Sequence, residues 1–316
     1  MRKGYKVVLF IGIGMVVAAL IILLVVFLTT GFQPRTMFAK ETDIKEEKVQ
    51  KEIVEKIHSL RVRSEEDDIV LKKSENEKCL VEFTERGKVD YELAVEDGKL
   101  ELVQKEESWK NPMNFMQNLL SKIPDNIFKH PYRIVISLPE NEYETLELEN
   151  VSGDIATEDV FFFDTAALST VSGDIYTKNL KTEGPLTVAA TSGDINLESS
   201  EAKGPLSISS VSGNILADHV DADSVQATLS SISGEISLKN SIFKILSAKT
   251  TSGDVNLELI EAGKLDITTV SGDVEGRVSK EMDFNCKTVS GDISVPEGGT
   301  NSWIIETTSG DIHITK

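Results

Sequence analysis

The sequence predicts an all-β protein folded as a parallel β-solenoid. Three observations predict it: a recurring Ser-Gly-Asp motif, a nearly constant interval between its copies, and apolar residues two apart within each copy. The glycines of the nine copies are 19–21 residues apart and are Gly153, Gly173, Gly193, Gly213, Gly234, Gly253, Gly272, Gly291 and Gly310. A period near 20 residues indicates one supersecondary unit stacked on copies of itself.

Apolar residues of the repeats fall into columns when the copies are aligned on the glycine. Ile or Val stands two residues after every glycine, and mostly Leu, Ile or Val stands five residues before it. Spacing of two is the strand period, and no window of the repeats keeps the spacing of a helix. We therefore expect about nine coils over residues 141–316, each with about two short strands and two corners. At the spacing of paired strands they form a stack about 40 Å long.

The Ser-Gly-Asp motif predicts the corner of each coil. Glycine permits a positive φ or a close approach of neighbouring backbone, and Ser and Asp hydrogen-bond nearby N–H groups. The residue after the glycine is Asp in seven copies, with Asn214 and Glu235 as the exceptions. Stacked carboxylates also suggest a Ca²⁺-binding ladder. We favour the polar corner, because the nonapeptide of known calcium rolls does not occur here.

The N-terminal region reads as a membrane anchor. Residues 7–28 are uncharged and mostly apolar, long enough for a helix to cross a bilayer, and three positive charges precede them. We expect residues 1–6 in the cytoplasm, an uncleaved signal anchor at 7–28 and a linker at 29–48. A cleaved signal peptide is the alternative, although the apolar stretch is long for one. The protein is then a single-pass plasma-membrane protein whose C-terminal domain is extracytoplasmic.

Residues 49–140 contain strand-like runs and are expected to form a β cap or degenerate coils at the end of the solenoid. Apolar residues at three-four spacing predict one short helical insertion at 112–128. This helix either covers the solenoid or serves as a Met-rich docking segment for a membrane or a partner.

Composition excludes several classes of function. The net charge of −19 becomes −22 once the three N-terminal positive charges are set aside, which argues against nucleic-acid binding. Cys79 and Cys286 lack the spacing of a metal site, and the four histidines form no ligand-like pair. We therefore assign no catalytic, cofactor-binding or metal-binding residues and expect a protein that is not an enzyme.

Two motifs resemble a bacterial family of β-strand-repeat proteins often labelled "putative adhesins", a domain of unknown function. They are Val-Ser-Gly-Asp-Ile at 151–155 and 171–175, and Ile-Ser-Leu-Pro at 136–139. The resemblance covers roughly residues 50–316. It implies a membrane-anchored protein encoded near envelope-stress regulators, and it brings no established active site to carry over.

Three functions remain open at this point. The first, which we favour, is an interaction or scaffold module that contacts cell-wall polymer or an envelope protein through a long repetitive face. The second is a Ca²⁺-dependent structural rod, and the third is an enzyme acting on polysaccharide. The chain ends within one strand of the last glycine, so we also expect an open terminal coil and end-to-end self-association.

Overall fold

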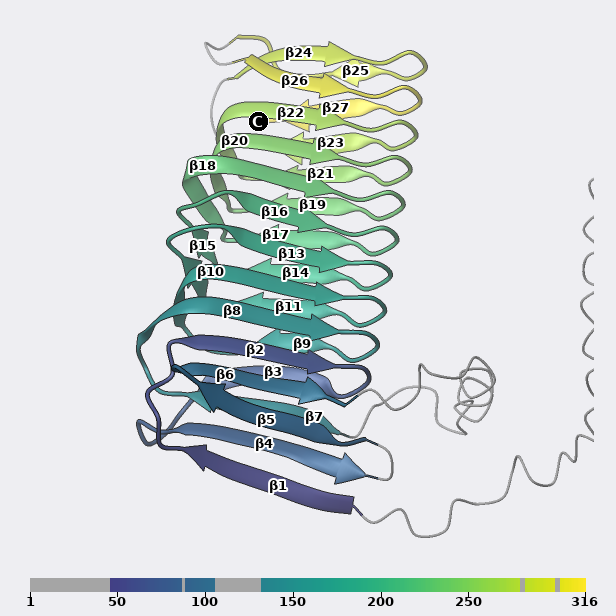
Figure 1. The fold of residues 1–316 in the computed structure, drawn as a ribbon. Coiled ribbons are helices and arrows are strands. Elements are labelled where there is room, and N and C mark those ends of the chain that lie inside the picture. Colours follow the sequence, from purple (N-terminus) through teal and green to yellow (C-terminus); the bar gives the residue numbers. More distant parts are fainter. Residues whose placement is uncertain (1–45, 87–88, 106–131, 279–281, 299–301) are drawn as a thin grey trace, which may run out of the picture. The chain divides into compact units, whose positions relative to one another are not determined.

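The secondary structure of the described residues consists of β-strands. The computed structural model describes residues 46–86, 89–105, 132–278, 282–298 and 302–316. The predicted anchor at 7–28 lies outside them, as does the predicted helical insertion at 112–128. The strands stack as a parallel β-solenoid (Figure 1), which confirms the predicted fold class.

Two long sheets wind around one core. Sheet A has 13 strands, in the spatial order β1 (Glu46–Ile53), β4 (Cys79–Arg86), β7 (Arg133–Leu138), β3 (Asp68–Lys73), β9 (Ile155–Thr157), β11 (Ile175–Lys178), β14 (Ile195–Glu198), β17 (Ile215–Asp218), β19 (Ile236–Lys239), β21 (Val255–Glu258), β23 (Val274–Arg277), β27 (Ile312–Thr315) and β25 (Ile293–Ser294). The path of sheet B is β24 (Asp283–Lys287), β26 (Ser302–Glu306), β22 (Glu261–Thr268), β20 (Ile242–Lys249), β18 (Asp221–Ser230), β15 (Glu201–Ala202), β12 (Leu180–Thr182), β10 (Phe161–Thr170), β8 (Glu142–Asn150), β2 (Ser59–Ser64), β6 (Lys99–Gln104) and β5 (Tyr91–Glu96). Two further strands of sheet B, β13 (Leu186–Ala190) and β16 (Leu206–Ser209), lie between β10 and β18.

In-register stacking buries the predicted apolar columns. Ile175 of β11 pairs with Ile155 on one side and Ile195 on the other, and each is at most 1% exposed. Sheet B supplies the facing columns, in which Leu146, Ala166 and Leu186 are direct neighbours. Almost all the buried apolar side chains of the described residues join one cluster, with Val70 as the exception. Full burial of each Leu or Ile contributes about 1.5–3 kcal/mol, so every added coil strengthens the same core.

The N-terminal end is closed by antiparallel strands around a buried charge. β4 pairs antiparallel with β1 and β7, and β5 pairs antiparallel with β6. The fully buried Asp67 accepts hydrogen bonds from Arg86 Nη1 at 2.9 Å and from Tyr91 Oη at 2.8 Å. Tyr132 places its ring centroid 3.8 Å from Arg86 Cζ. A buried carboxylate with these partners ties β4 and β5 to the turn between β2 and β3.

Both ends of the solenoid are interleaved, which the repeat pattern did not predict. The coil made of β26 and β27 lies between the coil of β22 and β23 and the coil of β24 and β25. At the other end, the coil of β2 and β3 lies between β6–β7 and β8–β9. The expectation of an open terminal coil is therefore wrong for the coil that ends the sequence, because β27 has a neighbour on both sides. The free end is formed by residues 283–294, as Figure 1 shows.

The repeat glycines are required by close backbone approach. None of the nine has a positive φ. Close approach of neighbouring backbone, and not a left-handed conformation, therefore explains the glycine. A Cβ at Gly213 would overlap the carbonyl oxygen of Gly193 in the preceding coil, and the same overlap recurs from coil to coil. Any side chain there would force neighbouring corners apart, against the fixed spacing of the paired strands.

A hydroxyl three residues before the glycine completes most of the corners. Thr250 Oγ1 accepts the backbone N–H of Gly253 at 3.1 Å and donates to the carbonyl of Gly234 at 3.2 Å. The column consists of Asn150, Thr170, Ala190, Ser210, Ser231, Thr250, Thr269, Thr288 and Thr307. Only Ala190 lacks a polar side chain.

Replacing Gly213 by alanine is expected to lower the free energy of unfolding by about 3 kcal/mol or more, because the new methyl meets a rigid carbonyl. Urea unfolding of the purified chain measures the change. Ser212→Ala, on the exposed neighbouring residue, serves as the control and should stay within about 0.5 kcal/mol of the original chain. Equal midpoints for the two variants would contradict the close-approach argument.

The hydroxyl column gives a matched pair of substitutions with opposite signs. Ala190→Ser should stabilise the protein by about 1 kcal/mol, because Ser210 in the next coil already makes both bonds. Thr250→Val should cost about 1–3 kcal/mol, since it leaves a buried N–H and a buried carbonyl unpaired. Both changes are measured by urea unfolding. A destabilising Ala190→Ser would show that the bridge does not transfer between coils.

Candidate functional site: an uncharged face on an acidic solenoid

The aspartates of the repeat form a hydrogen-bonded ladder along one corner. Asp154 Oδ1 accepts the backbone N–H of Asp174 at 2.8 Å, and the same bond recurs between most neighbouring coils. At the interleaved end the ladder follows space and not sequence. Asp273 accepts from Asp311 at 2.7 Å, and Asp311 accepts from Asp292 at 2.8 Å. The prediction that Asp caps nearby backbone is thus confirmed. The serine directly before the glycine makes no side-chain hydrogen bond to another described residue, and the hydroxyl three residues before the glycine bonds the corner N–H instead.

This geometry gives the calcium hypothesis no support. Oδ1 of each bonded aspartate is already aimed at a backbone N–H of the next coil. Among the residues that the structure describes, no group of three or more His, Cys, Asp and Glu side chains is arranged to hold a metal ion. A Ca²⁺ site would need six to eight oxygens around one point. The ladder instead spaces its carboxylates one coil apart.

Chemistry-bearing side chains do not combine into a catalytic arrangement in the described residues. Burial raises the pKa of the Cys79 thiol to about 12 and that of Cys286 to about 11, so both stay protonated at neutral pH and are poor nucleophiles. His58 Nδ1 lies 3.1 Å from Glu144 and 3.2 Å from the hydroxyl of Ser59. A catalytic triad needs the carboxylate and the nucleophile on opposite ring nitrogens, whereas here both face the same one.

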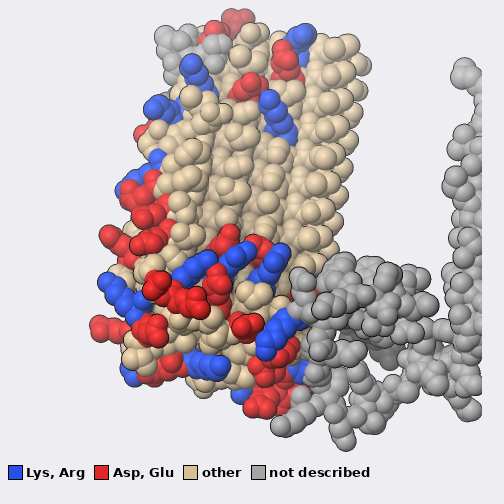
Figure 2. Space-filling model, in the orientation of Figure 1, with Lys and Arg blue, Asp and Glu red and all other residues tan. Residues whose placement is uncertain are grey.

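The outward face of sheet B carries a patch of small uncharged side chains. We name it the Ser/Thr strip, and it consists of Ala167, Ser169, Thr187, Ala189, Ser207, Ser209, Thr228, Ser230 and Ser247. Its members are in direct register across β10, β13, β16, β18 and β20. Charged residues bound the strip at both ends of the stack. Glu147 and Glu149 lie on β8 at one end, and Lys249 of β20 and Asp266 of β22 lie at the other. Figure 2 shows the resulting uncharged field between charged groups.

An exposed apolar ridge runs beside the strip, at the column two residues before the glycine. We name it the Val/Ile ridge, and it consists of Val151, Val171, Val211, Ile232, Val270 and Val289. Each of these side chains is between 42% and 74% exposed, and threonine occupies the remaining positions of the column. A regular row of exposed β-branched residues beside hydroxyls makes a surface of mixed character, with apolar and hydrogen-bonding groups alternating across one face.

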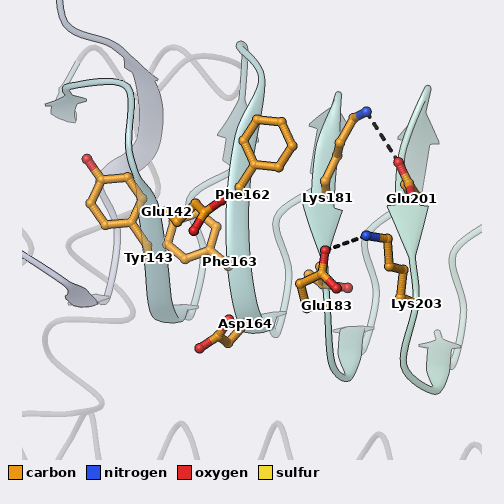
Figure 3. Close-up of a pocket in the computed structure, with 10 residues that line it drawn as sticks. Glu142, Tyr143, Phe162, Phe163, Asp164, Lys181, Glu183, Glu201 and Lys203 are labelled. Carbon is orange, nitrogen blue, oxygen red and sulfur yellow. Dashed lines mark hydrogen bonds and ion pairs between the residues drawn. The ribbon is translucent and has the colours of Figure 1, made fainter.

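A small hollow opens on the other side of the strip, at the outer end of β10 (Figure 3). Phe162 is 41% exposed there, and Lys181 Nζ lies 5.6 Å from the centre of its ring and 3.2 Å from Glu201. Lys203 is paired with Glu183. The hollow has a volume of about 200 Å³. That is below the roughly 300 Å³ of an ordinary small-molecule site, so it fits a single ring or side chain of a larger ligand.

Sequence reasoning missed the Ser/Thr strip and the hydroxyl column. Both could have been found by aligning the polar residues on the glycine as well as the apolar ones, because each occupies a fixed offset. The predicted docking helix at 112–128 cannot be placed against the strip, since it lies outside the described residues. Within those residues no helix has the length and hydrophobicity that a membrane crossing demands.

Comparison with solved structures finds distant similarities over most of the chain. A "putative adhesin" from Parabacteroides distasonis ATCC 8503 is 13% identical, with 86% of this chain and 98% of that chain covered and a TM-score of 0.47. A "putative adhesin" from Bacteroides fragilis NCTC 9343 is 15% identical, covering 85% and 96%, with a TM-score of 0.44. A "putative lipid binding protein" from P. distasonis is 17% identical, covering 87% and 98%, with a TM-score of 0.45.

These similarities are too distant to carry an argument about function. No functionally curated protein matches the sequence. The family model called Toastrack DUF4097 matches residues 57–231 and again residues 205–316, which together span most of the chain. The match includes the ladder, the strip and the ridge. The chain therefore belongs to the Toastrack DUF4097 family.

Proposed function

We propose that the protein is a membrane-anchored, extracytoplasmic β-solenoid that acts as a non-catalytic interaction or scaffold module at the cell envelope. Residues 7–28 serve as the uncleaved anchor, with the N-terminus in the cytoplasm. Their length and lack of charge, together with the positive charges before them, support this orientation.

The observation that carries the proposal is the Ser/Thr strip with its adjoining Val/Ile ridge. Charged residues make up 27% of the sequence, yet nine neighbouring outward positions of one sheet have none. Small side chains keep this face flat, and its hydroxyls repeat at the strand spacing of about 4.8 Å. Such a face suits an extended partner lying along several coils.

Cell-wall polymer fits this surface. A glycan presents hydroxyls that pair with the Ser and Thr side chains and C–H faces that pack on the Val/Ile ridge. Little charge has to be desolvated on the protein side when this face is covered. The exposed Phe162, beside the strip on the side away from the ridge, adds an aromatic surface of the kind that ligand sites use. The lack of a nucleophilic thiol or a catalytic histidine arrangement in the described residues supports binding without chemistry.

Charges placed on the strip should weaken binding to isolated cell walls. The test variant is Thr187→Glu with Thr228→Glu, on β13 and β18. The full chain is purified in detergent and sedimented with isolated walls of its own organism. Burying two unpaired carboxylates against a neutral polymer should weaken binding at least about tenfold, since each costs a few kcal/mol.

A matched control places the same charges on the opposite sheet. Ala156→Glu with Ser237→Glu puts two carboxylates on the outward face of β9 and β19, at the same net charge. Binding by this variant should equal that of the original chain, and both variants should remain in the membrane fraction of cells. Equal loss of binding in the two variants, or no saturable binding by the original chain, would overturn the proposal.

A further inference from the structure

Among the described residues, the C-terminal end of the solenoid has an unpaired strand edge in each sheet. β24 pairs with β26 alone and β25 pairs with β27 alone, and each strand is the outermost member of its sheet. Apolar side chains gather at this end. Val289 is 74% exposed, Ile293 is 45% exposed, and Phe284 and Cys286 are half-buried. Unpaired backbone next to apolar side chains is a template for another strand.

The two ends of sheet A differ in this respect. The outermost strand of sheet A at the N-terminal end is β1, whose sequence Glu-Glu-Lys-Val-Gln-Lys-Glu-Ile has five charged residues in eight. It pairs antiparallel with β4 and so belongs to a separate closing layer. Charged edge strands resist pairing with other chains. In sheet A an incoming strand therefore fits the C-terminal end better. The N-terminal edge of sheet B is β5, Tyr-Glu-Leu-Ala-Val-Glu, with two charged residues in six, and it differs from β24 in pairing antiparallel with its neighbour β6.

The sequence of β24 is complementary to itself in an antiparallel register. It reads Asp283-Phe284-Asn285-Cys286-Lys287, with Phe284 and Cys286 turned inward and the other three exposed. Antiparallel pairing centred on Asn285 places Asp283 opposite Lys287 of a second copy, twice. It also places Phe284 opposite Cys286 on the inner side. Residues directly opposite across an antiparallel pair point to the same face of the sheet. The Asp–Lys pairs therefore lie on the outer face and the Phe–Cys pairs on the inner face.

We propose that two copies of this chain associate end to end through β24, related by a two-fold axis at Asn285. The dimer continues sheet B across the axis by antiparallel pairing and covers the half-buried Phe284. The ring of Phe284 packs edge-on against that of Trp303, with 5.8 Å between the ring centroids. A closed two-fold contact uses up the free end, so association stops at two copies. Asp283 and Lys287 form no ion pair with another described residue, and the dimer supplies their partners.

Thiol cross-linking tests the register directly. Asn285→Cys brings two thiols face to face on the axis, and a short bismaleimide should convert the full chain in membranes to a covalent dimer. Ser207→Cys, exposed on β16 away from this end, is the matched control, and the original chain shows the background from Cys79 and Cys286. Cross-linking of Asn285→Cys no greater than that of Ser207→Cys would overturn the proposal.

Charge exchange tests it independently of folding. Asp283→Lys alone and Lys287→Asp alone each create two like-charge pairs and should raise the dimer dissociation constant about tenfold. Mixing the two variants should restore dimers, because every Lys then faces an Asp of the other copy. Sedimentation equilibrium of the full chain in detergent measures each case. Misfolding would not be repaired by mixing, so failure of the mixed sample to dimerise while the original chain dimerises refutes the register.

The proposal is separate from binding through the strip. Thr187→Glu with Thr228→Glu lies on coils distant from β24 and should leave cross-linking at Asn285→Cys unchanged. Loss of wall binding with dimers intact would locate the wall contact on the strip alone. A monomeric original chain at every accessible concentration would overturn the dimer and leave the proposed wall binding standing.

Discussion

The fixed separation of stacked coils is the constraint on which the rest of the structure depends. Hydrogen-bonded strands hold neighbouring coils about 4.8 Å apart, and the corners must follow at the same distance. The carbonyl of each repeat glycine then lies where the Cβ of the next would stand, which leaves glycine as the residue that fits. The remaining corner groups adapt to this contact. Asp caps the following backbone N–H, and Ser or Thr bridges the glycine N–H of its own coil and the glycine carbonyl of the coil before it.

Much of this architecture is readable from the sequence, because stacking in register turns structure into periodicity. Ile155, Ile175 and Ile195 each stand two residues after a repeat glycine, and this constant offset makes them buried neighbours in successive coils. The left-handed residues six places after the glycine were not recognised, although Asn179 and Asn240 are suited to a positive φ. His219 and Leu259 occupy the same position at φ near 50°. Because the residue type at this position varies from coil to coil, the position does not stand out in the sequence. Their conformation is set by the turn of the coil, and not by their own preference.

The spatial order of the coils at the two ends could not be predicted from the repeats. Every coil has apolar residues at the same offsets, so the pattern allows any coil to stack on any other. Leu265 would accept Phe284 or Trp303 as its neighbour in the same column, and it pairs with Trp303. Side-chain size and polarity settle the choice. Trp303 is 1% exposed and donates its indole N–H to the carbonyl of Ala262 at 3.2 Å, which requires an interior coil. Ile314 packs over Gly276, the one glycine in its column, which leaves room for a larger neighbour. Such decisions rest on three-dimensional fit, which a periodic sequence does not encode.

Stacking also explains why the Ser/Thr strip is informative about function. Like charges at one position of successive coils repel. The Asp ladder offsets this repulsion with hydrogen bonds to backbone N–H groups, and several other positions alternate the sign of the charge. Lys181 pairs with Glu201 at 3.2 Å, Lys178 with Glu198 at 3.0 Å, and Arg277 with Glu258 at 3.2 Å. These exposed pairs contribute little to stability, about 0–1 kcal/mol each, but they keep a stacked surface charged and soluble. Charges of alternating sign could also stand at the nine positions of the strip. Neither folding nor solubility therefore requires these positions to be uncharged. An uncharged surface that the fold does not require is best explained by what it binds, which supports the proposal of a flat, uncharged partner for the strip.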